Sequence, residues 1–587
     1  MFKILKRMNR KSVGLILICI VFIVFQVWLD LRLPDYMSNI TKLVQTEGSQ
    51  MSEILEQGGY MILCALGSLA SAIIVGYFAS YIAASFSKQL RKDVFYKVEN
   101  FGMEELKKFS TSSLLTRTTN DITQIQMLIA MGLQLTIKAP ITAVWAVSKI
   151  AGKNMEWTVL TGGAVLVLIL FISILIAITL PKTRKVQELT DNLNRVTREN
   201  LKGIRVVRAF NAEEYQEAKF NEANEALTKT NLFVQRMMGL MTPLMQFVMS
   251  GISLGIYIIG AYLINAAGLT DRLNLFSDMV VFSSYSMQVI MAFMMLIVIF
   301  IILPRAQVSA NRILEVLNTE EKIKDGTINK TDGKVKGKVE FRDVSFQYPD
   351  ADEPILEHIS FTAEKGETVA FIGSTGSGKS TLINLVPRFY DVTEGEVLVD
   401  DINVKDYTLE ALHNKLGYIP QKAVLFRGTI ESNVTYGKTD HEKPNQEKVK
   451  EAIRVAQASE FVEKKPEKYQ APIAQGGSNV SGGQKQRLAI ARAIARDPEI
   501  YIFDDSFSAL DYKTDFVLRK ELKEYTKEAT TLIVAQRIGT VKNADKIIVL
   551  DEGKMVGCGT HEELLKTCKV YQEIALSQLS KEELENG

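Results

Sequence analysis

Long stretches without a charged side chain occupy the first half of the chain. They are residues 13–29, 57–87, 122–148, 157–181, 237–270 and 279–304, and the only charge among them is Lys138. As helices, runs of this length cross a hydrocarbon layer about 30 Å thick. A backbone in lipid must also satisfy its own hydrogen bonds, which a helix does internally. The sequence therefore predicts an all-α membrane domain with six spans.

Lysine and arginine are unevenly distributed between the connecting loops. The N-terminus and the stretches 88–117 and 182–236 are rich in both residues, whereas the other loops carry few. Basic loops stay on the cytoplasmic side, so we expect both termini and the two long loops in the cytoplasm. The long loops keep helical periodicity and are expected to continue the membrane helices. The first span lacks a small-residue cleavage site, so it is interpreted as a retained span.

The composition changes after the last span. We expect a transmembrane domain at 1–318, a linker rich in Lys, Asp, Gly and Thr at 319–337, and a soluble-type α/β domain at 338–587, which the motifs described next assign to nucleotide binding. A net charge of +2 suggests no nucleic-acid partner. The four cysteines show neither a disulfide framework nor metal-ligand spacing.

A phosphate-binding loop lies between an apolar run at 368–372 and a helix-like run at 382–385. It reads Gly373, Ser374, Thr375, Gly376, Ser377, Gly378, Lys379, Ser380 and Thr381. Glycines allow backbone N–H groups to close around phosphate oxygens, the lysine supplies positive charge, and the Ser380 hydroxyl can bind Mg²⁺. The loop predicts binding of ATP or GTP.

Three further features accompany this loop. Asp504 ends the apolar strand 500–503, where P-loop enzymes place an aspartate that holds Mg²⁺. Ser481, Gly482, Gly483 and Gln484 precede the helical run 488–495, an arrangement that binds anions or simply caps a helix. Tyr348 follows an alternating strand and is either a base-stacking residue or a residue at the edge of the core.

Together these motifs resemble the ATP-binding cassette (ABC) transporters, and six spans followed by one cassette resemble a half-size exporter. The resemblance implies ATP and Mg²⁺ as cofactors and assigns a role to each motif. Tyr348 would stack on adenine, residues 373–381 would be Walker A, and Gln421 the Q-loop residue that also meets Mg²⁺. Residues 481–484 would be the signature, Asp504 the Walker B aspartate, and residues 508–511 the D-loop. Residues 113–121 and 199–210 look like the two coupling loops.

Family membership also implies that two cassettes dimerise head to tail, each ATP lying between Walker A of one and the signature of the other. One chain carries one cassette. A second half-transporter subunit is therefore required, identical or different.

Three positions depart from the family pattern. Asp505 stands where the family has a catalytic glutamate, Gln536 where it has the switch histidine, and Gln475 where many exporters have a glutamate before the signature. The shorter Asp505 carboxylate falls about 1 Å short, and losing the alignment of a general base costs about 10²- to 10⁴-fold in rate. Gln536 donates a hydrogen bond but carries no proton charge. This pattern resembles the degenerate-site subunit of bacterial heterodimeric multidrug exporters.

That resemblance implies a partner with an intact glutamate and histidine, whose competent site this chain completes through Ser481, Gly482, Gly483 and Gln484. The location would be a bacterial plasma membrane, and the substrates amphipathic or apolar compounds. Two alternatives stay open. One is a homodimeric lipid or peptide exporter in which Asp505 serves as base; the other is a regulatory nucleotide-sensing subunit.

Methionines and charges in the membrane half could bear on the transported molecule. Methionines gather at positions 237, 241, 245 and 249 and again at 287, 291, 294 and 295. They would form a pliable surface for apolar ligands or serve in helix packing. The ionisable residues Asp30, Arg32, Asp35, Lys138 and Asp278 would mark a pathway if they lie within the bilayer, or the membrane interface if they lie near helix ends.

Overall fold

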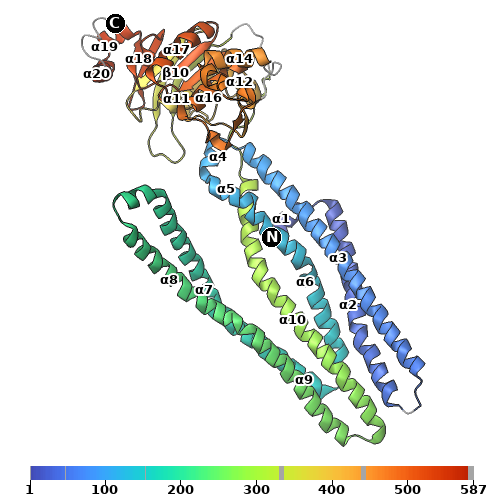
Figure 1. Cartoon of the computed structure of the whole chain (residues 1–587). Helices are drawn as coiled ribbons and strands as arrows, with labels where there is room; N and C mark the ends of the chain where they lie inside the picture. Colours follow the sequence, from blue (N-terminus) through green and yellow to red (C-terminus); the bar gives the residue numbers. More distant parts are fainter. Residues whose placement is uncertain (1, 47, 152–153, 330–335, 438–444, 579–587) are drawn as a thin grey trace. The chain divides into compact units, whose positions relative to one another are not determined.

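The computed structural model describes residues 2–46, 48–151, 154–329, 336–437 and 445–578 (Figure 1). Residue 1 of the expected membrane domain, residues 330–335 of the expected linker and residues 579–587 of the expected nucleotide-binding domain lie outside the described residues. The chain divides into two compact units: Met1–Glu99 with Thr111–Asn318, and Asn100–Ser110 with Thr319–Gly587.

The described residues of the first unit lie in helices and in the short segments that join them. Six of its helical segments are long and apolar enough to cross a membrane, which confirms the six predicted spans. Its helices are α1 (Phe2–Leu5), α2 (Arg10–Gln45), α3 (Met51–Glu99), α5 (Thr111–Thr118), α6 (Asn120–Ile150), α7 (Met155–Ala209), α8 (Glu213–Gly239), α9 (Met241–Ala266) and α10 (Leu269–Asn318).

The second long loop is made of continued helices, as predicted. α7 has 55 residues, and at 1.5 Å per residue it is far longer than a bilayer is thick. α7 and α8 lie side by side as a hairpin (Figure 1). α8 ends at Gly239 and α9 begins at Met241. Pro243 in the first turn of α9 has no N–H to continue the hydrogen bonds of α8, which explains the break.

Charged residues of the membrane helices pair with one another. The Lys138 ammonium on α6 lies 3.1 Å from the Asp30 carboxylate on α2, and the Ser68 hydroxyl on α3 donates to Asp30 at 2.5 Å. Lys149 pairs with Asp35 at 2.8 Å, and the Tyr285 hydroxyl donates to Asp35 at 2.6 Å. Paired in this way, the two carboxylates on α2 also join it to α6.

The second unit contains a four-stranded antiparallel sheet, a six-stranded sheet and a short two-stranded pair. The first has the order β2-β1-β4-β5, the second β12-β11-β3-β10-β9-β6 and the pair is β7-β8. The strands are β1 (Val339–Phe346), β2 (Leu356–Ala363), β3 (Thr368–Gly373), β4 (Glu394–Val399), β5 (Ile402–Asn403), β6 (Leu416–Ile419), β7 (Gly428–Thr429), β8 (Pro472–Ile473), β9 (Ile500–Asp504), β10 (Thr530–Val534), β11 (Lys546–Asp551) and β12 (Lys554–Gly559).

Helices cover these sheets (Figure 1). They are α4 (Met103–Lys108), α11 (Lys379–Leu385), α12 (Leu409–Asn414), α13 (Ile430–Val434), α14 (Gln446–Val455), α15 (Ser459–Glu463), α16 (Gly482–Arg496), α17 (Tyr512–Tyr525), α18 (Ile538–Val541), α19 (His561–Thr567) and α20 (Lys569–Gln578), with 3₁₀ turns at Lys468–Gln470 and Gln475–Gly477.

The central strands of the six-stranded sheet are buried on both faces. All residues of β9 and β10 are buried. Successive side chains of a strand point to opposite faces. Accordingly Tyr501 and Phe503 of β9 join one apolar core, whereas Ile500 and Ile502 join the other. Strands covered on both faces read as continuous apolar runs, which is why residues 500–503 were recognisable as a strand.

Two segments outside the expected nucleotide-binding domain belong to this second unit. From the expected linker, Gly326 donates its N–H to the Tyr407 carbonyl at 2.9 Å and Ile328 bridges the same residue. From the first long loop, α4 is held by Glu105, which accepts from the Lys322 N–H at 3.1 Å. Gly102 at the start of α4 has an extended backbone, so that loop is not one continuous helix. The linker segment is therefore held by a residue of the nucleotide-binding domain, and α4 is held in turn by the linker.

Candidate nucleotide site

Four parallel strands bring the predicted site residues to one edge of the six-stranded sheet. β3 pairs with β10, β10 with β9, and β9 with β6, all in parallel. The carboxyl ends of parallel strands meet at the same edge, where ligands bind in open α/β sheets. The phosphate loop follows β3, and the other three strands lead to Gln536, to Asp504 with Asp505, and to Gln421.

The phosphate loop depends on glycine at places that other residues cannot occupy. Gly376 and Gly378 have φ of +90° and +92°, which side chains strongly disfavour. A Cβ on Gly373 would lie 2.0 Å from the Leu550 carbonyl oxygen of the neighbouring strand β11. Leu550 therefore fixes how closely the loop approaches the sheet, and α11 starts at Lys379, within the last three residues of the loop.

The Lys379 ammonium lies inside the curve of the loop. It donates to the carbonyls of Gly373 and Ser374 at 3.0 and 2.6 Å, and to the Ser377 hydroxyl at 3.2 Å. Burial lowers the pKa of Lys379, and the charges of Asp505 and Asp504 oppose that shift. The loop thus presents a largely desolvated cation, which strengthens its attraction for phosphate.

Ser380 and Asp504 form the pair of oxygens expected at a Mg²⁺ site. The Ser380 hydroxyl donates to Asp504 Oδ1 at 2.7 Å. Burial raises the pKa of Asp504, and the Ser380 hydrogen bond opposes the rise. Among the described residues, no group of three or more His, Cys, Asp or Glu side chains could hold a metal. This pair fits Mg²⁺, which proteins bind through one or two oxygens while phosphates and water supply the others.

Asp505 accepts hydrogen bonds from two other predicted site residues. Its Oδ2 accepts from Gln421 Nε2 at 3.3 Å and from Gln536 Nε2 at 3.1 Å. Asp505 has a φ of +45°, and its N–H donates to the Val534 carbonyl at 3.0 Å. Burial raises the pKa of Asp505, opposed first by the hydrogen bond from Gln421. The contact of Gln421 in this structure is with Asp505 rather than with the Ser380–Asp504 pair.

The signature residues lie at the exposed start of α16. Ser481 and Gln484 cap the helix reciprocally, at 3.3 Å from the Gln484 N–H to the Ser481 hydroxyl and 3.0 Å in the other direction. Within the described parts of the chain, no hydrogen bond or ion pair joins residues 481–484 to the phosphate loop 373–381. One turn on, buried Gln486 donates to the Pro420 carbonyl at 3.3 Å, next to Gln421.

Tyr348 and α4 meet at the side of the phosphate loop. The Tyr348 hydroxyl is 3.0 Å from the Thr381 hydroxyl, which holds the ring beside α11. The Lys107 ammonium of α4 lies 4.0 Å from the centre of the Tyr348 ring and 5.3 Å from that of Tyr390. Sequence reasoning missed Lys107, because nothing near it in the chain indicates that it contacts the Tyr348 ring, more than two hundred residues away.

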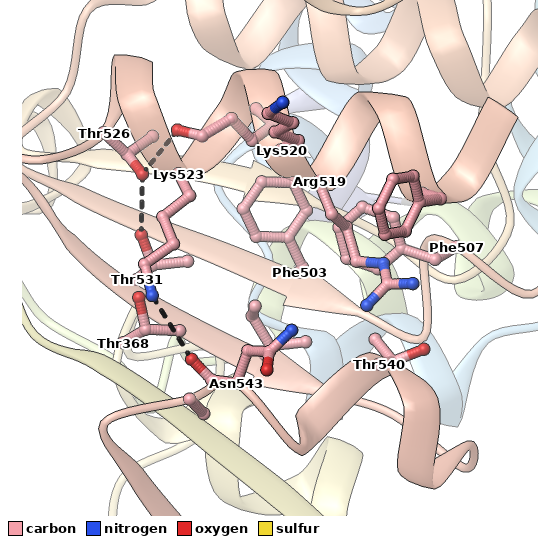
Figure 2. A pocket seen from close by; sticks show the side chains of 14 residues that line it. Thr368, Phe503, Phe507, Arg519, Lys520, Lys523, Thr526, Thr531, Thr540 and Asn543 are labelled. Carbon is pink, nitrogen blue, oxygen red and sulfur yellow. Dashed lines mark hydrogen bonds between the residues drawn. The ribbon is translucent and has the colours of Figure 1, made fainter. Parts of the chain in front are cut away.

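A separate cavity of about 390 Å³ lies between α17 and the six-stranded sheet. Figure 2 shows Thr526 and Thr531 on one side of it, Phe507 on the other, and Phe503 between them. None of the predicted site residues lines this cavity. It is therefore not the nucleotide site.

An apolar cavity, also of about 390 Å³, lies within the membrane unit between α7, α9 and α10. Met245 and Met294 line it together with apolar residues such as Ile172 and Phe293, and its one hydroxyl belongs to Ser173. The structure thus brings one methionine from each predicted group to the same cavity. Met291 instead lies on the surface, 45% exposed.

Comparisons with known proteins agree with this arrangement. The family model described as ABC transporter transmembrane region matches residues 16–321, and that described as ABC transporter matches residues 356–508. An uncharacterized ABC transporter ATP-binding protein of Mycobacterium tuberculosis is 41% identical over 522 residues, covering 89% of this chain and 87% of that protein. The ATP-dependent lipid A-core flippase of Pseudomonas aeruginosa is 30% identical over 505 residues, covering 86% and 82%.

Among solved structures, a bacterial Atm1-family ABC exporter with ATP bound superimposes with a TM-score of 0.79. It covers 97% of this chain and 99% of its own at 23% identity, a level that shows the fold. The predicted fold class is confirmed: six apolar helices followed by an α/β ATP-binding domain.

Proposed function

The chain belongs to the ABC transporters as an exporter-type half-transporter, and we propose that it is one subunit of a heterodimeric exporter whose own site binds ATP but hydrolyses it slowly. ABC exporters work as dimers of half-transporters that hydrolyse ATP. The degenerate site, the non-identical partner and the multidrug type are the parts that we add.

The observation that carries the proposal is the environment of Asp505. The carboxylate at the catalytic position accepts hydrogen bonds from two amides, Gln421 and Gln536, on the same oxygen. Two N–H donors on Oδ2 favour the ionised carboxylate and compete with a water molecule for its lone pairs. Oδ2 is therefore already occupied by the two amides, which opposes its use as the oxygen that takes a proton from water.

The chemistry of Gln536 also supports slow hydrolysis at this site. An imidazole at the switch position can carry a proton, whereas the carboxamide of Gln536 is a neutral donor and acceptor. With a shortened carboxylate and an uncharged switch, hydrolysis at this site should be slower by about 10²- to 10⁴-fold. Lys379, Ser380 and Asp504 retain the groups for phosphate and Mg²⁺, so binding of MgATP should persist.

The signature residues would then serve the partner. Ser481, Gly482, Gly483 and Gln484 are intact and lie at the exposed end of α16, where a second cassette can reach them. ATP retained at this chain's site would stabilise the cassette dimer, and hydrolysis at the partner's site would reset it. We place the transporter in a bacterial plasma membrane with both termini in the cytoplasm, exporting amphipathic or apolar compounds through the methionine-lined region of the membrane unit.

Isolation of the native complex tests this proposal. The full chain carrying an affinity tag is expressed in its own cells, and the proteins that copurify from membranes are identified by mass spectrometry. We expect a second half-transporter, in equal amount, with glutamate after its Walker B aspartate and histidine at its switch position. Recovery of tagged and untagged copies of this chain alone, in an ATP-hydrolysing complex, would contradict it.

A homodimeric lipid exporter is the second candidate. It is favoured by similarity to the Pseudomonas aeruginosa protein, whose name describes a lipid A-core flippase, and by the apolar cavity beside Met245. In that case the purification yields only this chain, and Asp505 must act as the base in both sites. The two candidates therefore predict opposite outcomes of the same isolation.

A further inference from the structure

Gln578 of helix α20 hydrogen-bonds to the switch segment, which we define as residues 535–541. Gln578 Nε2 donates to the Gln536 carbonyl at 2.7 Å, and Gln578 Oε1 accepts from the Ile538 N–H at 2.8 Å. A carboxamide offers one donor edge and one acceptor edge. Gln578 uses both on backbone groups two residues apart, as a neighbouring β-strand would.

Buried side chains hold α20 in the position from which Gln578 reaches the switch segment. Tyr571 and Ala575 are fully buried in the core against the sheet, and the Tyr571 hydroxyl is 2.7 Å from His561 Nδ1. Residues 571, 575 and 578 recur at helical spacing and so share one face of α20. That face packs against β3 and β11, the strands that carry and flank the phosphate loop.

The switch segment lacks a cap of its own. α18 begins at Ile538, and its N-cap residue Arg537 makes no side-chain capping hydrogen bond. The first N–H groups of a helix have no partner within the helix. Gln578 accepts from one of them across forty positions of sequence and simultaneously holds the carbonyl of Gln536.

The side chain of Gln536 in turn reaches Asp505 Oδ2 at 3.1 Å. We infer that Gln578 is a positioning residue for the nucleotide site: it fixes the backbone on both sides of Arg537 and thereby sets the reach of Gln536. The inference deepens the proposed function, on which the role of Gln536 beside the nucleotide rests. It assigns to the end of the chain a part in retaining ATP at this site.

Hydrogen exchange separates the two hydrogen bonds of Gln578. Gln578→Ala loses both, whereas Gln578→Glu keeps the acceptor for Ile538 and loses the donor to Gln536. Gln572→Ala is the matched control, because Gln572 lies on the same helix and donates to the Leu565 carbonyl at 2.7 Å, away from the switch segment. All three are made in the full complex in lipid nanodiscs, with exchange followed by mass spectrometry over residues 535–541.

Without nucleotide, Gln578→Ala should speed exchange of the Ile538 amide about 2- to 10-fold, as expected for loss of one hydrogen bond. Gln578→Glu should keep that amide protected, and so should Gln572→Ala. Unchanged exchange in Gln578→Ala, or an equal increase in Gln572→Ala, would overturn the inference. The exchange measurement does not depend on which site hydrolyses ATP. Its result therefore tests the inference independently of the proposed function.

Retention of ATP supplies the functional arm. The rate of release of radiolabelled ATP is measured in complexes whose partner has alanine for its Walker A lysine, so that only this chain's site is loaded. Both Gln578 variants should release ATP about 2- to 10-fold faster, because both lose the bond to Gln536. Release at the parental rate in both variants would show that Gln578 merely anchors α20, as Gln572 does.

Discussion

Asp504 and Asp505 are adjacent carboxylates with different partners. Asp504 accepts from the Ser380 hydroxyl, whereas Asp505 accepts from the amides of Gln421 and Gln536. Burial raises the pKa of both groups. The two carboxylates therefore differ in their partners and not in the effect of burial. Under the proposed function, Asp504 beside a hydroxyl binds a cation, whereas Asp505 with two amides on one oxygen serves as a fixed charge.

The pKa of Asp504 gives a test at this scale. Mg²⁺ needs the ionised carboxylate, and protonation competes with the metal as the pH falls. Because burial raises this pKa, loss of MgATP affinity should begin at a higher pH than for an exposed aspartate, whose pKa is about 4. Binding is measured by fluorescence of a nucleotide analogue between pH 8 and pH 4.5.

Asp504→Asn is the control, since it removes the titrating group. We expect weaker Mg²⁺ dependence and a flatter pH profile in this variant. A parental profile that stays constant across the whole range, or one that Asp504→Asn leaves unchanged, would contradict the role assigned to Asp504.

At the scale of the helices, the ion pairs of the membrane unit allow a direct test of what holds neighbouring helices together. Asp30→Asn should leave the Lys138 charge without its partner and lower stability by about 1–2 kcal/mol. Combining it with Lys138→Met removes the orphaned charge and should restore part of the loss. Thermal unfolding in detergent measures both variants.

Lys185→Met provides the comparison, because the Lys185–Glu188 pair on α7 is more than half exposed. Exposed pairs contribute at most about 1 kcal/mol, so this variant should be close to the parent. If Asp30→Asn is as stable as Lys185→Met, the Asp30–Lys138 pair does not contribute to the stability of the contact between α2 and α6.

The cavity between α7, α9 and α10 gives a prediction about substrates. Met245→Trp fills part of the 390 Å³ space and should weaken stimulation of ATP turnover by apolar compounds about 10-fold, while ATP binding stays unchanged. Met155→Trp is the control at a residue that is 76% exposed on α7. Equal effects of the two variants would remove the cavity from the transport path.

At the same scale, periodicity and charge predicted most of the fold. Uncharged runs marked the six spans, because lipid-facing helices tolerate little else. The strands β3, buried along its centre, and β9, buried throughout, were recognisable beside their motifs. Hydrogen bonds between distant segments left no local signal. The packing of residues 100–110 and 319–329 with the nucleotide-binding domain, the Lys107–Tyr348 contact and the bonds of Gln578 all emerge only in three dimensions.

The site was predictable where each motif carries its own chemistry. Gly373, Lys379 and Asp504 have roles that spacing alone indicates, since a phosphate loop and a strand-end carboxylate recur together. The sequence did not predict that Gln421 and Gln536 both donate to Asp505 Oδ2. That arrangement depends on the parallel strand order β3-β10-β9-β6.

At the scale of the whole transporter, we propose two unequal ATP sites. One is built from this chain's phosphate loop with Asp505 and Gln536, and the other is completed by its signature residues. An asymmetric pair of this kind holds ATP at the first site while turnover proceeds at the second. The rate of hydrolysis should therefore depend on the partner's glutamate and hardly at all on Asp505.

ATP turnover of the reconstituted complex directly measures how far hydrolysis depends on each of these two carboxylates. We predict that Asp505→Asn lowers turnover less than about 2-fold, whereas changing the partner's Walker B glutamate to glutamine lowers it about 10²- to 10⁴-fold. Turnover that survives the change in the partner and disappears with Asp505→Asn would contradict the account, because Asp505 would then be the working base.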